Sequence, residues 1–353
     1  MSDSATTSST ASANSDGTDP VANRSEIVFA YDAEDTNPNG NPLSANNRPR
    51  IDETTGAAIV TDVRLKRYLR DQLDNDDHGI YVKNPIKSEF EDVPGRDELF
   101  TRVTELDEED LESMTGNEAA DAFLENAIDV RYFGATCSFS SDFQDSLGEE
   151  FPGQFIGPLQ FSHARSLNTV VQKGETKQLS TVVASDTDKG QGTFATDNRL
   201  QYAFVPFHGI VNEIGAEDTL LSETDVERLD SLLWRAIKNQ TLTRSKMGHQ
   251  PRLYLRVEYG TDAFHIGTLD DGIDLVQETP DDELRNITDI VVGIDGLLND
   301  LDAYSEHIET VHVTADRHLT VAVDGEQGGP DALYGAIEEI VGTEAVDRIE
   351  PYA

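Results

Sequence analysis

Alternating apolar and polar positions mark the first strand of a folded unit. In residues 25–31 the apolar side chains of Ile27, Phe29 and Tyr31 recur at every second position, which predicts a strand with one buried face. Seven other apolar or alternating segments are expected to be strands, at residues 131–139, 157–171, 200–211, 253–259, 287–292, 308–314 and 319–323.

Apolar positions three and four residues apart predict two principal helices. The first starts at a cap formed by Thr61 or Asp62 and ends near residue 73. The second follows Ser222, with Asp225 three residues later, which is the spacing of a capping box. With the insertions set aside, the order is strand, helix, strand, strand, helix, strand. This order predicts an α+β fold with a ferredoxin-like (RRM-like) palm.

Two segments interrupt this palm, and both differ from it in composition. Residues 80–130 are strongly acidic and predict a helical insertion. Residues 172–199 are polar, rich in Gly, Thr, Asp and Lys, and predict a projecting hairpin or flexible loop. We expect palm and insertions to form one domain over residues 25–353.

The two ends of the chain carry other patterns. Ten of the first eighteen residues are Ser or Thr, so residues 1–24 are expected to form a disordered tail. Residues 261–353 form an acidic C-terminal part that includes a helix with Pro330 at its first position.

The charge balance indicates a salt-rich host. The chain has 68 acidic and 27 basic residues, a net charge of −41, and the acids are spread through segments with clear apolar periodicity. Such a surface suits a halophilic cytoplasm, because at 1 M salt the screening length is only about 3 Å. No apolar run reaches the length of a membrane span, and no secretion signal is present, so we expect a cytoplasmic protein away from membranes. The lone Cys137 and scattered histidines predict no metal or other cofactor.

Three windows without a single acid interrupt this acidic background, at residues 36–51, 151–174 and 235–257. The third holds six bases. Bases separated from acids in this way indicate a face reserved for a polyanion, although chance and a basic helix end would give the same pattern.

Several motifs in and around these windows resemble one family. They are the runs 37–42 (NPNGNP), 47–50 (NRPR), 60–67 (VTDVRLKR), 131–135 (RYFGA), 157–162 (GPLQFS), 165–168 (RSLN) and 244–248 (RSKMG). Together they look like the CRISPR-RNA-binding backbone subunit of type I-B Cascade (Cas-seven family, Csh-two subtype).

The resemblance implies a non-enzymatic protein that polymerises along guide crRNA as a filament. Its fold would be a ferredoxin-like palm with finger insertions and a thumb, at residues 169–200, that folds over RNA held by the next copy. The guide would pair with target DNA beside other Cascade subunits, and a recruited nuclease-helicase would cut that DNA.

The same motifs supply the candidate RNA ligands. Amides in a tight turn bind phosphate or ribose, guanidinium groups grip phosphate bidentately, and a Gly-containing loop exposes backbone N–H groups. The candidates are Asn37, Asn39, Gly40, Arg48, Arg50, Arg64, Lys66, Arg67, Arg165, Lys173, Arg244, Lys246 and Gly248. A plain turn, a solvated helix face, pairing with acids of a neighbouring subunit and a purely structural loop are the competing explanations.

Two other functions compete with the guide-binding subunit. An RNA endonuclease, as in type III relatives of this fold, would use a loop aspartate, here Asp32, Asp35 or Asp52. None of the three has a second carboxylate at a fixed metal-binding spacing. A generic single-strand binder is the other alternative, but a bare palm would suffice for it without the extensive insertions.

Overall fold

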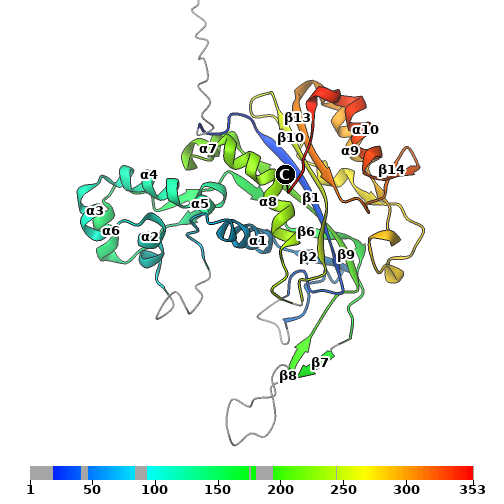
Figure 1. The fold of residues 1–353 in the computed structure, drawn as a ribbon, viewed down its shortest axis with the longest axis horizontal. Coiled ribbons are helices and arrows are strands. Elements are labelled where there is room, and N and C mark those ends of the chain that lie inside the picture. The colour runs from blue at the N-terminus through cyan, green and yellow to red at the C-terminus, as the bar shows by residue number, and fades with distance from the viewer. Residues whose placement is uncertain are drawn as a thin grey trace, which may run out of the picture.

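The computed structural model describes residues 19–40, 47–83, 94–174, 176–179, 194–243 and 245–352. It is the mixed α+β fold that the sequence predicts, built on a six-stranded sheet in the order β16-β13-β10-β1-β9-β5 (Figure 1). Those strands are β1 Ser25–Glu34, β5 Leu159–Phe161, β9 Tyr202–Val211, β10 His249–Tyr259, β13 Ile308–Ala315 and β16 Val346–Arg348.

Four of these strands and two helices reproduce the predicted order. Strand β1 lies between β9 and β10 and is antiparallel to both, and β5 is antiparallel to β9. Helix α1 (Asp62–Asn75) connects β1 towards β5, and α8 (Glu223–Lys238) connects β9 to β10. Along the chain the unit therefore runs β1, α1, β5, β9, α8, β10, and the strands lie in the order β10-β1-β9-β5.

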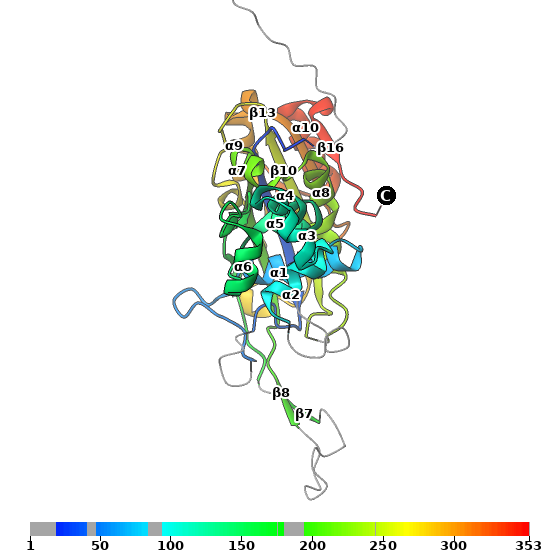
Figure 2. The same cartoon turned by 90° about the vertical axis from the view of Figure 1, so that its left-hand side faces the viewer.

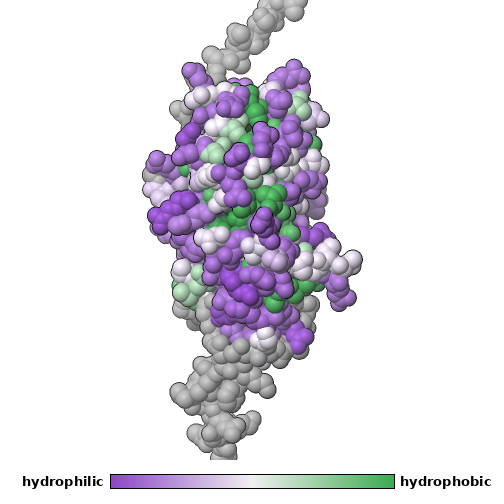
Figure 3. Space-filling view, turned by 90° about the vertical axis from the view of Figure 1, so that its right-hand side faces the viewer, coloured by the Kyte–Doolittle hydropathy of each residue, from purple (hydrophilic) through white to green (hydrophobic). Residues whose placement is uncertain are grey.

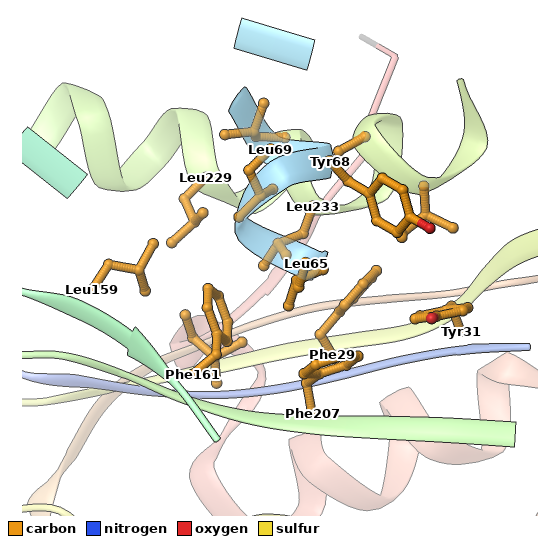
Figure 4. Close-up of a cluster of buried hydrophobic side chains, with 14 of the residues drawn as sticks. Phe29, Tyr31, Leu65, Tyr68, Leu69, Leu159, Phe161, Phe207, Leu229 and Leu233 are labelled. Atoms are coloured by element: carbon orange, nitrogen blue, oxygen red, sulfur yellow. The ribbon is translucent and has the colours of Figure 1, made fainter. Parts of the chain in front are cut away.

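One face of the sheet is covered by α1 and α8. The odd-numbered residues Ile27, Phe29 and Tyr31 of β1 are fully buried against it, as the alternation predicts. Figure 4 shows Leu65 and Leu69 of α1 lying over this face beside residues of α8. Helix α8 starts at the expected capping box, with the Ser222 side chain accepting from the backbone of Asp225.

The opposite face of the sheet is covered by the C-terminal part. Val28 and Ala30 of β1 are buried in a second core that includes Leu301 and Ile337. This part contains α9 (Asp295–Ala303), α10 (Pro330–Val341) and a small sheet in the order β11-β12-β14-β15. Its strands are Asp274–Leu275, Val292–Gly293, Val321–Val323 and Glu326–Gly328. Its outer face is mostly hydrophilic, with an apolar patch near the middle (Figure 3).

Short turns replace some of the predicted regular structure here. The strand predicted at residues 287–292 is instead a 3₁₀ turn followed by β12, because Asn286 caps the turn with its side chain. The 3₁₀ turns are Leu269–Gly272, Asp281–Glu283, Ile287–Asp289, Ser305–His307 and Thr343–Ala345.

The acidic insertion is helical, as predicted, and has its own aromatic core. Phe100, Phe123 and Phe151 pack with ring centroids 4.9–6.3 Å apart. Its helices are α2 Arg96–Thr104, α3 Glu108–Ser113, α4 Gly116–Asn126 and α5 Ile128–Phe133. Two helices from outside residues 80–130 pack beside them, α6 (Ser141–Leu147) against α3 and α7 (Glu213–Thr219) against α5. The strand expected at residues 131–139 is wrong. Helix α5 continues to Phe133, and only Gly134–Thr136 forms a strand, β3, paired with β4 (Gln154–Ile156).

The extended segment predicted at residues 157–171 is split into β5 and β6 (Ala164–Thr169), and β6 pairs with β2 (Ala57–Val60). Within the predicted thumb, β7 (Thr176–Leu179) and β8 (Phe194–Asp197) pair antiparallel and project from one end of the molecule (Figure 2). Residues 180–193 of the predicted thumb lie outside the described residues.

The folded part begins earlier than residue 25. Residues 1–18 of the predicted tail lie outside the described residues, but Val21 is buried and its N–H donates to the carbonyl of Leu221. The Arg24 guanidinium lies 2.8 Å from the carboxylate of Glu213. Residues 19–24 are therefore anchored on α7 and α8, and the expected boundary at residue 24 is wrong for them. No helix in the described ranges is long and apolar enough to cross a membrane.

Candidate nucleic-acid interface

The three acid-free windows meet at one end of the sheet. The backbone N–H of Asn37 donates to the carbonyl of Ser245 at 3.1 Å, and that of Leu200 donates to Thr36 at 2.7 Å. The N–H of Lys173 donates to the carbonyl of Arg199 at 2.9 Å. We call residues 34–40, 47–52, 171–173, 196–200, 243 and 245–249 the loop junction. It lies at the base of the β7–β8 hairpin.

The asparagines of the first motif hold the junction together. The Asn37 side-chain amide donates to the carbonyl of Asn47 at 2.7 Å, and that of Asn39 donates to the Thr61 hydroxyl at 3.1 Å. Thr61 is the N-cap residue of α1, yet its side chain caps no helix N–H. A Cβ atom on Gly40 would lie 2.3 Å from Oδ1 of Asn47, so a larger residue at position 40 would displace the Asn47 amide.

The predicted bases of α1 have partners within the protein. Lys66 donates to Gln160 at 2.7 Å and lies 3.4 Å from Asp62, and burial lowers the pKa of its ammonium group. Arg67 pairs with Asp71 one turn along the helix. The Arg64 guanidinium lies over the Tyr68 ring, 5.7 Å from its centroid.

Other candidate bases lie at the exposed rim of the loop junction. The side chains of Arg165 and Lys173 are 59% and 44% exposed and pair with Asp52 and Asp35. Exposed ion pairs of this kind contribute about 0–1 kcal/mol, so a phosphate can compete for these cations. Arg48 and Arg50 are exposed on either side of Pro49, which is bridged to Gly40. Four of the candidate bases therefore have side chains at the protein surface, where a polyanion would have access to them.

The basic third window does not form a basic face. Arg235 pairs with Asp76, Arg252 with Asp32 and Arg256 with Asp230, at 2.7–3.0 Å. The bases of a sequence segment that contains no acids are therefore paired, in the folded protein, with acids from other elements. Arg252 is the extra residue of a β-bulge opposite Ala30 and Tyr31, which directs its side chain towards Asp32.

Lys246 has a structural role in the junction that the sequence does not reveal. Its ammonium group donates to the carbonyls of Asn37 and Pro38, which connects the loop that carries it to the first motif. Burial, and then the nearby Arg64 cation, lowers the pKa of Lys246 to about 7. A Cβ atom on Gly248 would lie 2.0 Å from the carbonyl oxygen of Glu34. Arg244 lies outside the described residues.

His249 lies beneath Lys246 between two aromatic rings. Its ring centroid is 5.3 Å from that of Tyr31 and 6.2 Å from that of Tyr68. Burial lowers its pKa well below 6.5, and the Lys246 cation lowers it further. His249 is therefore a neutral residue of the core.

A polar cavity of about 370 Å³ opens beside Lys246. It is lined by amide, hydroxyl and carboxylate side chains, those of Asn37, Asn47, Thr196, Asp197, Asn198, Thr243 and Ser245. Sequence reasoning identified only Asn37 of this set as a candidate. Asn47 and Ser245 belong to quoted motifs, but Thr196, Asp197, Asn198 and Thr243 had no distinguishing signal in the sequence.

The three aspartates of the endonuclease alternative are engaged in other contacts. Asp32 is fully buried, pairs with Arg252 and accepts from the Tyr202 hydroxyl, and burial raises its pKa to about 6. Asp52 caps a turn through the N–H groups of Thr54 and Thr55. The described part of the chain shows no group of three or more His, Cys, Asp or Glu placed to hold a metal ion.

Comparison with known proteins identifies the family. A family model described as CRISPR-associated protein Cas7 matches residues 23–295. This chain belongs to the Cas7 family. A relative from Haloferax volcanii, named CRISPR-associated protein Cas7, is 43% identical over 331 residues, which cover 90% of this chain and 94% of that protein. The Cas-seven resemblance of the motifs is confirmed, and a haloarchaeal relative fits the acidic composition.

Two solved structures align with this Cas7-family chain at low sequence identity. One, titled "CRISPR RNA-guided surveillance complex, pre-nicking", aligns with a TM-score of 0.48 and 12% identity over 93% of this chain and 97% of the other. Another, titled "CRISPR RNA-guided surveillance complex", aligns with a TM-score of 0.43 and 12% identity over 93% and 96%. The Cas7 match itself spans the whole loop junction and stops within the C-terminal part.

Proposed function

We propose that this Cas7-family protein is the crRNA-binding backbone subunit of a type I-B CRISPR Cascade effector complex in a salt-rich cytoplasm. The observation that carries the proposal is that three of the seven family motifs, at residues 37–40, 47–50 and 245–248, meet in one loop junction. The strand order β10-β1-β9-β5, with both connecting helices on one face, supports a ferredoxin-like palm. The β7–β8 hairpin is the proposed thumb.

The guide strand would follow the exposed rim of the loop junction. Arg48, Arg50, Arg165 and Lys173 would contact phosphates, while Asn39, Gly40, Lys246 and Gly248 would hold the loops in place. Arg64, Lys66, Arg67 and Arg244 remain candidates for further contacts. Counterion release contributes little in molar salt, so affinity would rest on hydrogen bonds, shape and repetition of weak sites along one RNA.

The partners follow from this arrangement. Copies would polymerise along the guide, protect it and present it for pairing with target DNA. Other Cascade subunits would complete the complex, and a recruited nuclease-helicase would cut the DNA. The protein would not be the nuclease itself, since Asp32 is buried against Arg252 and Asp52 is used by a turn.

Pull-down of the tagged protein from its host, followed by sequencing of bound RNA, tests this function. Spacer-derived guides should dominate the RNA, and Arg48→Ala with Arg50→Ala should reduce them at an unchanged melting temperature. Arg317→Ala, an exposed base on the C-terminal part, is the matched control and should retain them. A bound RNA population without spacer sequences would reject the proposal.

A further inference from the structure

The polar cavity of the loop junction is built to receive a hydrogen-bond donor. Asn37 lines it and is 3% exposed, and its Oδ1 accepts no hydrogen bond from the described part of the chain. The amide is fixed in this orientation, because its Nδ2 already donates to the carbonyl of Asn47. A buried acceptor without a donor costs about 1–3 kcal/mol, so this oxygen calls for a ligand that supplies one.

The lining excludes a phosphate from the same cavity. Asp197 contributes a carboxylate, which pairs with Arg199 at 2.8 Å and places a negative charge in the lining. The candidate cations Arg165 and Lys173 lie outside the lining, where they pair with other acids. An anion would therefore be held at the rim, whereas the cavity favours a neutral group that donates hydrogen bonds.

The walls of the cavity are held rigidly. Asn47 has a left-handed backbone, with a φ of 49°, and its side chain occupies the space that a Cβ on Gly40 would take. Ser245 is joined to Asn37 by a backbone hydrogen bond. A volume of about 370 Å³ is at the small end of ligand sites, which suits one sugar unit rather than an extended ligand.

We infer that this cavity binds a ribose of the guide and that Oδ1 of Asn37 accepts a hydrogen bond from its 2′-hydroxyl. The inference rests on the proposed function. A sugar fits better than a base because a guide subunit must accept any spacer sequence, and the sugar is the same at every position. The 2′-hydroxyl is also the group that distinguishes RNA from DNA. The cavity would thus select RNA over DNA once per copy.

Synthetic guides with single sugar changes test this inference on the unaltered protein. Binding is measured in molar salt for guides with a 2′-deoxy sugar at each position in turn. Deoxy substitution at the positions seated in the cavity should weaken binding about five-fold, the usual effect of one lost hydrogen bond. A 2′-fluoro sugar, which accepts but does not donate, should weaken it equally at those positions.

The Asn37→Ala variant then tests whether Asn37 is the residue that accepts the hydrogen bond from the 2′-hydroxyl. In this variant the deoxy and unmodified guides should bind equally, because the acceptor is gone. Asn117→Ala, an exposed asparagine on α4, is the matched control and should keep the five-fold difference. A thermal melt shows whether Asn37→Ala folds. If it does not, the binding of the 2′-deoxy and 2′-fluoro guides by the unaltered protein still tests whether the cavity binds a ribose.

Equal binding of all deoxy guides by the unaltered protein would overturn the ribose cavity. Persistence of the five-fold difference in folded Asn37→Ala would overturn the role of Asn37. Neither result touches the proposed function, which fails only if spacer-derived RNA is absent from the pull-down.

Discussion

Replacing Lys246 with methionine should remove a pH dependence of stability that the wild-type protein has. The ammonium group is largely buried beside Arg64 and donates to the carbonyls of Asn37 and Pro38. Its pKa is about 7 in the folded protein, against 10.5 for the ordinary side chain. Between these values the unfolded chain binds more protons than the folded one, so wild-type stability should rise with pH across this window.

The size of this rise has an upper bound. The difference of 3.5 between 10.5 and 7, at about 1.4 kcal/mol for each unit, gives at most about 5 kcal/mol. Because Lys246 keeps some exposure to solvent, we expect about 1–3 kcal/mol. Lys246→Met has no group to titrate, so the difference in unfolding free energy between wild type and variant should grow by this amount from pH 7 to pH 10.

Denaturant titrations in molar salt at several pH values measure the difference directly. Arg64→Met serves as a cross-check, because without that cation the Lys246 pKa should rise and the window should begin at higher pH. If the unfolding free energies of wild type and Lys246→Met change with pH in parallel, burial does not lower the pKa of Lys246 as argued. The guide should be lost from Lys246→Met together with thermal stability, unlike the loss from the rim arginines.

Three further predictions concern other parts of the molecule. Deleting residues 1–18 should leave the melting temperature unchanged. Deleting residues 1–22 should lower it, because the buried side chain of Val21 is then lost from the core. Equal melting temperatures for the two deletions would show that residues 19–22 contribute nothing to stability. Gly248→Ala should cost about 1–3 kcal/mol in denaturant titrations, since the new methyl meets a backbone carbonyl, and wild-type stability would contradict the close approach. Wild-type protein with Mg²⁺ and guide-paired RNA should yield no cleavage products on a denaturing gel, and products that Asp35→Asn abolishes would restore the endonuclease alternative.

The sequence predicted the elements whose side chains repeat regularly. The alternation around Phe29 and the capping box at Ser222 each identified a correct element. The short apolar run that ends at Phe133 fits a strand or a helix equally well, and packing against α4 and α7 decides for the helix.

The candidate site was harder to predict because the partners of a basic side chain are the residues that lie near it in the folded protein, not those near it in sequence. Arg256 stands in an acid-free stretch but contacts Asp230 from α8, so its charge is not available at the surface. Lys246 was correctly placed in a junction loop, but its bonds to carbonyls depend on a loop two hundred residues away. The cavity residues come from separate loops that only the fold brings together.

Both faces of the central sheet are covered, one by α1 and α8 and the other by the C-terminal part. This arrangement puts the residues that stabilise the fold and the residues exposed at the rim in different parts of the structure. Side chains that determine stability lie between the layers, whereas those exposed at the rim sit in loops that carry little of the core. Under the proposed function, a substitution at Arg50 would change the affinity for the guide at little cost in folding stability. The core can meanwhile adapt to a new temperature or salinity without altering what is bound. We expect relatives from different habitats to vary these two sets of positions independently.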